Sequence, residues 1–196
     1  MLNKELYARD ISGDVVLLKK ISTGDTESLR KLYNQYSDYL FKIVFYILKN
    51  ESDAEDTLQE VFMQIWEHSE KYDEKLGSPI SWIVRVTRNK SIDKLRSKGY
   101  RERENQFDID RFYNLSSDEP SENPDSVMTI NSTSEQIKSA IDTLSDIQKE
   151  LLEFTYFRGF SQSELAEHFE LPLGTVKTCI RTAMIKLRDK LKHLIN

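Results

Sequence analysis

Apolar residues recur every three or four positions along most of this chain, and this spacing limits the fold more than any other feature of the sequence. Between Leu29 and Leu48 they occupy positions 29, 32, 33, 36, 40, 43, 44, 47 and 48. The segment TLQEVFMQIW carries a second stripe of the same spacing, and a third begins at Ile137. Such a period places apolar side chains on one face of an α-helix. Because no segment shows the alternation, bounded by turns, that is typical of a strand, the sequence predicts an all-α fold.

Residues that favour helix termini divide these stripes into separate helices. A capping box, in which Ser and a Glu or Gln three residues later bind each other's backbone N–H groups, is predicted at three places: Ser52 with Glu55, Ser145 with Gln148, and Ser161 with Glu164. Ser78 and Pro79 suit the N-cap and the first position of a further helix, which is expected to end at Gly99. Trp82, near the start of that helix, is expected in the core.

The helical period stops between residues 101 and 133. This segment contains two prolines and is rich in Asp, Glu, Ser and Asn. Segments of about 30 residues without secondary structure are uncommon inside compact domains. We therefore predict two small helical domains, 1–100 and 134–196, joined by a flexible acidic linker at 101–133. The alternative is one domain with a long surface loop.

The charges of the chain are separated into bands. In total, 33 Asp and Glu exceed 28 Lys and Arg, and the net charge is −5. Residues 51–74 are strongly acidic, whereas residues 82–103 contain eight basic residues opposed by Asp93 and Glu102. A second basic band lies near the C-terminus, from Lys177 onward. Since a phosphate responds to the potential within about 10 Å at moderate salt, an acidic total does not exclude nucleic acid as a partner.

Several classes of protein are disfavoured. No apolar run approaches the roughly 20 residues that cross a bilayer, and the first residues lack the apolar core of a signal peptide. The single cysteine, Cys179, cannot form an internal disulfide, which favours the cytoplasm and a packing role over a redox role. The three histidines have no partners at metal-ligand spacing, and no phosphate-binding loop or nucleophile motif occurs. We therefore expect neither a cofactor nor an enzyme.

The segment 161–191 has the pattern of a helix-turn-helix. A short helix is followed by a turn at Glu170–Pro172 and by a second helix with an apolar inner face at Val176, Ile180, Ala183 and Leu187. The outer face carries cationic and hydroxyl side chains near the helix N-terminus, where they could reach base edges in a major groove. A merely solvated charged face is the alternative. The nearly pure cationic character of this face favours DNA binding.

Four segments of the chain resemble one family of proteins. LPLGTVKTCIRTAMIKLRDKL resembles the promoter-recognising helix of bacterial sigma factors. Three further segments match the N-terminal domain of the same family in the right order: ESLRKLYNQYSDYLFKIV, DAEDTLQEVFMQIW and SPISWIVRVTRNKSIDKLRSK. The chain therefore resembles the short extracytoplasmic-function (ECF) group of the sigma-70 family. It departs from the family pattern at Glu170, where Gly is usual, at Pro172, where a capping Ser or Thr is common, and at Cys179, where a basic residue is common. Pro172 still suits a first helical position.

The resemblance implies three binding surfaces. The surface for core RNA polymerase would comprise Asp56, Gln59, Glu60 and Met63. The surface for the promoter −10 element would comprise Arg85, Arg88, Asn89, Lys90 and Lys94, with a base pocket shaped by the loop at 68–78. The surface for the −35 element would comprise Thr175, Lys177, Thr178, Arg181 and Thr182.

On this basis the chain is identified as an ECF-type sigma factor that binds core polymerase, recognises and opens promoter DNA, and starts transcription. The family also implies an anti-sigma factor as a partner. Two alternatives compete with this interpretation. One is a stand-alone helix-turn-helix regulator that binds an operator without polymerase. The other is an interaction protein that uses its helices only for protein contacts.

Overall fold

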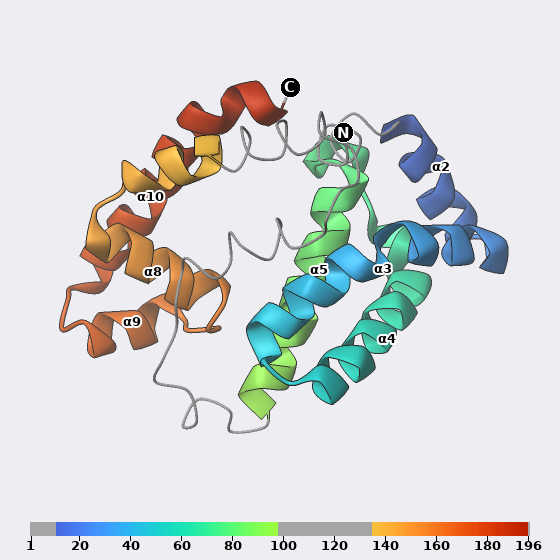
Figure 1. The fold of residues 1–196 in the computed structure, drawn as a ribbon, viewed down its shortest axis with the longest axis horizontal. Coiled ribbons are helices and arrows are strands. Elements are labelled where there is room, and N and C mark those ends of the chain that lie inside the picture. The colour runs from blue at the N-terminus through green and yellow to red at the C-terminus, as the bar shows by residue number, and fades with distance from the viewer. Residues whose placement is uncertain (1–10, 98–134, 196) are drawn as a thin grey trace. The chain divides into compact units, whose positions relative to one another are not determined.

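The computed structural model describes residues 11–97 and 135–195, which fall into two compact units (Figure 1). Every regular element in these two ranges is a helix, so the prediction of an all-α fold is confirmed. None of the described helices is both long and apolar enough to cross a bilayer. The predicted linker at 101–133 and the predicted helix end at Gly99 lie outside the described residues.

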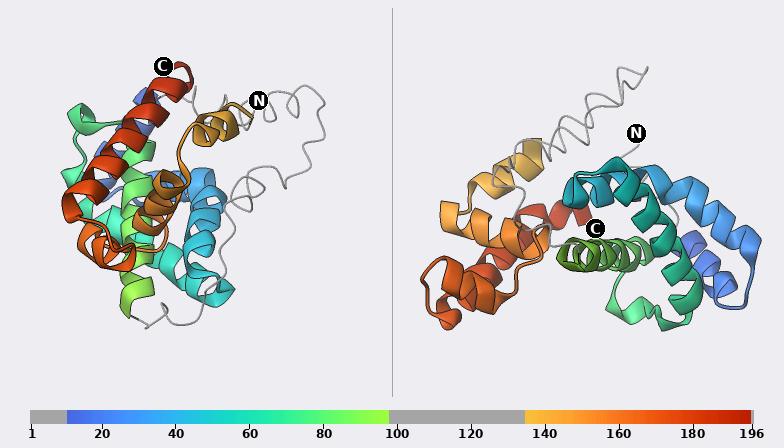
Figure 2. Two further views of the ribbon diagram at one scale, coloured as in Figure 1. Left: turned by 90° about the vertical axis from the view of Figure 1, so that its left-hand side faces the viewer. Right: turned by 90° about the horizontal axis from the view of Figure 1, so that it is seen from below.

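Within residues 11–97, the first unit contains four α-helices: α2 (Ile11–Ile21), α3 (Thr26–Leu48), α4 (Glu51–His68) and α5 (Pro79–Ser97). Two single 3-10 turns, η1 (Ser69–Lys71) and η2 (Glu74–Leu76), join α4 to α5. Helices α3, α4 and α5 pack against one another, and α2 packs against α3 and α5 (Figures 1 and 2). The core between them is made by the predicted stripes, with Leu32, Leu40, Val61 and Ile65 fully buried. Trp82 is also buried, as expected.

The start of α4 differs from the prediction. The cap is Asn50, whose side-chain oxygen accepts from the backbone N–H of Asp53 at 2.9 Å, and Ser52 lies inside the first turn. The preceding residue, Lys49, adopts a left-handed conformation with φ of 54° and ends α3. The chain therefore turns from one helix to the next within Lys49 and Asn50. Asn suits an N-cap as well as Ser does, so the tight corner decides which of them is used. The predicted cap at Ser78 before Pro79 is confirmed, since Ser78 oxygens accept from Ser81 N and Trp82 N.

The second unit contains a helical stretch at 135–142, α8 (Asp146–Tyr156), α9 (Gln162–His168) and α10 (Leu173–Ile195). Both predicted capping boxes are present, Ser145 with Gln148 at the start of α8 and Ser161 with Glu164 at the start of α9. Gly159 lies between α8 and α9 with φ of 67°, a conformation that Gly adopts without strain. The core joins all three labelled helices through Leu151, Leu165, Val176 and Ile180.

The turn between α9 and α10 forms at the predicted residues. Glu170, which stands where Gly is usual in the family, has φ of 52°, and Leu171 N donates to Ala166 O at 2.9 Å. The carbonyl of Pro172 accepts from Val176 N at 3.2 Å, so Pro172 is the cap and Leu173 is the first helical residue. Pro172 thus ends the turn predicted at Glu170–Pro172, and the start of α10, which the sequence left open, is fixed at Leu173.

Candidate nucleic-acid and protein interfaces

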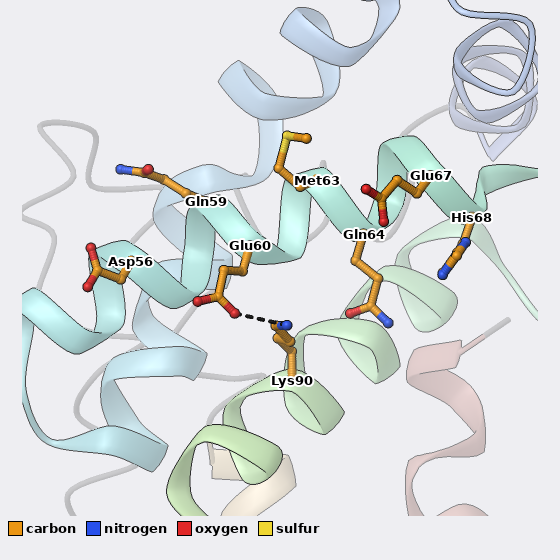
Figure 3. Close-up of a pocket in the computed structure, with 8 residues that line it drawn as sticks. All are labelled: Asp56, Gln59, Glu60, Met63, Gln64, Glu67, His68 and Lys90. Atoms are coloured by element: carbon orange, nitrogen blue, oxygen red, sulfur yellow. Dashed lines mark ion pairs between the residues drawn. The ribbon is translucent and has the colours of Figure 1, made fainter. Parts of the chain in front are cut away.

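Three residues of the predicted polymerase surface share one exposed face of α4. Asp56, Gln59 and Met63 follow one another at intervals of three and four, opposite the buried stripe of the same helix. Met63 is 56% exposed, so an apolar side chain lies open to solvent on this face. Together with Glu60 and with Lys90 of α5, the three side chains are among the residues that line an open groove of about 690 Å³ (Figure 3).

Glu60, the fourth residue of this predicted surface, points to the adjacent helix instead. Its carboxylate lies 2.9 Å from Lys90 Nζ (Figure 3). It also lies 3.5 Å from the Nζ of Lys94, one turn further along α5. The hydrogen bond from Lys90 and the positive charge of both lysines hold the pKa of Glu60 below its ordinary value, against the opposing effect of partial burial. The sequence placed Glu60 on one predicted surface and the lysines on another. The structure joins the two surfaces at this ion pair.

The pairing of Glu60 with Lys90 predicts how the stability of the fold depends on pH. Because the folded-state pKa is lowered, the pair stabilises the fold above the unfolded-state pKa of about 4.3 and loses this effect as the pH falls through the folded value. We expect Lys90→Met to raise the pKa of Glu60 toward its ordinary value, measured by NMR titration of the side-chain carboxyl carbon. Lys31→Met, an exposed change on α3, is the matched control. An unchanged Glu60 pKa in the Lys90 variant would contradict the pairing.

Helix α5 presents the remaining predicted −10 residues on its solvent side. Arg85 and Asn89 are exposed and lie four residues apart, on one face. Arg88 is half-buried and its Nη1 donates to Asn89 Oδ1 at 3.2 Å. On the opposite face Thr87 and Ser91 are buried, and each donates its hydroxyl to a carbonyl one turn earlier. Helix α5 thus has an exposed face with an amide and neighbouring cations, and a buried face whose two hydroxyls are hydrogen-bonded.

The loop between α4 and α5 is held by residues that sequence reasoning did not identify. Lys19 Nζ of α2 lies 2.5 Å from the Glu74 carboxylate of η2, across 55 positions of sequence. Tyr72 donates to Gly77 O at 3.1 Å and its ring lies 6.0 Å from that of Trp82, edge-on. Leu76, at the tip, is 75% exposed. No local pattern links Lys19 to this loop, because α2 is brought to it only by the packing of the unit.

The predicted −35 residues divide into two groups on α10. Thr175, Lys177, Thr178 and Arg181 are exposed. Thr182 is half-buried, and its hydroxyl oxygen accepts from Gln148 Nε2 of α8 at 3.1 Å. Cys179 is half-buried and packs against the core of the unit, in agreement with a packing role. The sequence pattern identifies Gln148 only as a capping residue and does not predict its contact with α10.

Two family models match this chain in succession. The model described as Sigma-70 region 2 matches residues 32–101, and the model described as Sigma-70, region 4 matches residues 140–189. The first match contains α4 and α5 with their predicted surfaces. The second contains the helix-turn-helix with its predicted surface.

Individual relatives match over most of the chain. The ECF RNA polymerase sigma factor SigK of Mycolicibacterium vanbaalenii is 24% identical over 172 residues, which cover 88% of this chain and 86% of the relative. The SigK protein of Mycobacterium sp. (strain JLS) is 26% identical over 176 residues, which cover 89% and 88%. Among solved structures, Rhodobacter sphaeroides SigE in complex with the anti-sigma ChrR is 25% identical, with coverage of 92% and 98% and a TM-score of 0.44.

Proposed function

Because this chain belongs to the sigma-70 family of RNA polymerase sigma factors, within its ECF group, we propose that it carries out initiation through the surfaces described above. It binds core RNA polymerase, recognises a promoter of two elements and starts transcription there. The observation that carries this proposal is the succession of a region 2 match and a region 4 match along one chain, each with an exposed polar or cationic helix face. A stand-alone regulator would need only the second of these.

The exposed face of α4 is suited to core polymerase. Asp56 offers negative charge, Gln59 offers an amide, and Met63, one turn further along α4, offers an apolar, adaptable side chain. Such a combination fits a partner helix that carries cationic side chains around an apolar contact. Glu60 lies at the margin of this face, where it is already bound to Lys90 and Lys94.

The exposed face of α5 is suited to an opened −10 element. A base outside the stack is recognised by hydrogen bonds to its polar edge, and its backbone is held by cations. Asn89 supplies an amide with both donors and an acceptor, and Arg85 and Arg88 lie beside it. The loop at 69–78 precedes this face and carries the exposed Leu76.

The exposed N-terminal half of α10 is suited to a duplex −35 element. Arg181 can make two hydrogen bonds to a guanine edge in the major groove, and Lys177 can bind a base edge or a phosphate. Residues 173–188 of α10 contain no acidic side chain, so no negative charge within this stretch offsets the positive charge of the face. We propose that these residues read sequence, in contrast to the more distal Arg188.

We also propose the cytoplasm as the site of action, because core polymerase and promoter DNA are there. In the ECF group an anti-sigma factor commonly holds the sigma factor inactive, and we propose such a partner here. We assign no catalytic step to this chain, since polymerase carries the chemistry of RNA synthesis.

The test of the proposed function is a binding titration of the purified chain against core polymerase, followed by transcription from a promoter library. Saturable binding with start sites that core polymerase alone does not use is the expected result. These start sites also supply the −10 and −35 sequences used below. Sequence-specific DNA binding by the chain without any affinity for core polymerase would favour the stand-alone regulator and overturn the proposal.

Arg181→Ala is expected to lower the affinity of the holoenzyme for the −35 element by roughly 10- to 100-fold, because it removes one bidentate contact with a base. The measurement compares duplexes with the recovered and the scrambled −35 sequence. Arg188→Ala, which removes the same charge two turns further along α10, is the matched control and should weaken both duplexes alike. Equal losses on both duplexes for Arg181→Ala would show that it binds phosphate only.

A further inference from the structure

Gln148 is a buried polar side chain between α8 and α10. It lies in the first turn of α8 and is 8% exposed. Its Oε1 accepts from Ser145 N at 3.2 Å, and this bond completes the capping box. Both polar atoms of this amide also contact α10, and these contacts serve no capping purpose.

The contact with α10 involves two residues one turn apart. Gln148 Nε2 donates to Thr182 Oγ1 at 3.1 Å, and Lys186 Nζ donates to Gln148 Oε1 at 3.3 Å. The apolar contacts between these helices, such as Leu151 with Val176 and Ile180, are not directional. Hydrogen bonds are directional, and two of them to successive turns of one face restrict rotation of α10 about its own axis.

Thr182 has no proton left for a DNA base. A hydroxyl carries one hydrogen, and the hydroxyl of Thr182 donates it within α10, since its Oγ1 lies 2.9 Å from Thr178 O and 3.0 Å from Cys179 O. One of its lone pairs is taken by Gln148. Unlike the neighbouring Arg181, which is exposed, Thr182 is half-buried.

We propose that Gln148 is a positioning residue for −35 recognition, and that Thr182 acts through Gln148 and not by touching DNA. This inference rests on the proposed function. Side chains reach roughly 5–6 Å from a helix axis, so a rotation of about 20° moves them by about 2 Å. Such a displacement breaks a hydrogen bond to a base edge. The amide of Gln148 therefore sets the direction in which Arg181 and Lys177 are presented.

A double-mutant cycle separates a positioning role from direct contact. Thr182→Val removes the hydroxyl and keeps the shape, Gln148→Met removes the amide and keeps most of the length, and Thr182→Ser restores a hydroxyl. The readout is the affinity ratio of the holoenzyme for the recovered over the scrambled −35 duplex. Effects of either variant on stability or on phosphate binding cancel in this ratio or in the cycle.

Thr182→Val is expected to lower the ratio by about three- to tenfold in the parent chain and to have no effect in the Gln148→Met background, while Thr182→Ser keeps the parent ratio. In NMR spectra of the chain without DNA, Thr182→Val should shift the side-chain amide signals of Gln148. Should Gln148→Met fail to fold, Gln148→Glu takes its place, because it keeps oxygens for Ser145 and Lys186 and has no N–H for Thr182.

Two results would overturn the inference. An equal loss from Thr182→Val in both backgrounds would mean that Thr182 contacts DNA directly. No loss in either background would mean that the contact has no part in recognition. Arg181→Ala is measured beside them, because an unchanged ratio for that variant would refute the −35 assignment of α10 itself.

Discussion

Leu151→Ala is expected to abolish −35 binding by unfolding the second unit, with no loss of structure in the first. Leu151 is fully buried and is in the core cluster with Leu165 of α9 and with Val176 and Ile180 of α10. Truncation of a buried leucine costs about 2–5 kcal/mol. A unit of about 60 residues has a total stability of the same size, roughly 3–5 kcal/mol. The second unit of the variant is therefore unfolded in a large fraction of the molecules.

The measurement is amide NMR of the full chain, in which signals from α8, α9 and α10 should collapse while those from α3, α4 and α5 persist. Binding to core polymerase through α4 should survive, at reduced affinity. Ile185→Ala, at a residue 46% exposed on the same unit, is the matched control and should leave the spectrum nearly unchanged. Loss of signals from both units in Leu151→Ala would mean that the two units fold as one.

Asn89→Ala is expected to reduce promoter opening by roughly 10- to 100-fold, because one pair of base-edge hydrogen bonds contributes about 1–3 kcal/mol. The exposed position of Asn89 on α5 makes a folding effect small. The measurement is the rate of open-complex formation by the holoenzyme on its recovered promoter, followed by permanganate reactivity of unpaired thymines.

Asn34→Ala provides the same substitution at an exposed position of α3, away from the predicted −10 surface, and should open the promoter at the parent rate. Core polymerase affinity should be the same for both variants. If Asn89→Ala opened the promoter as fast as the parent chain, the assignment of Asn89 to base recognition would be refuted.

Local sequence signals predicted the helices well where a cap and an apolar stripe agreed. Ser145 and Ser161 form their capping boxes, and Ser78 precedes Pro79 at the start of α5. The prediction failed at the start of α4, where both Asn50 and Ser52 are suitable caps. The left-handed residue Lys49 selects Asn50, and nothing in the local pattern of Lys49 predicts that conformation.

The candidate surfaces show a similar division. Helical spacing was sufficient to group Lys177 with Arg181 on α10, whereas Asp56, Gln59 and Met63 of α4 were grouped by the family resemblance. It could not foresee that Glu60 faces Lys90 and Lys94, since spacing along one helix says nothing of which helix lies beside it.

The sequence alone determined the all-α fold, the separate helices, the family resemblance and the exposed helix faces. These depend on contacts within one or two turns, which a sequence encodes directly. The ion pair of Glu60, the Lys19 contact with Glu74 and the Gln148 contact with Thr182 join residues 30 to 55 positions apart. Such contacts depend on how helices pack, because packing brings together side chains that share no local pattern. The rotation of α10 about its axis, which we propose that Gln148 sets, belongs to this second group.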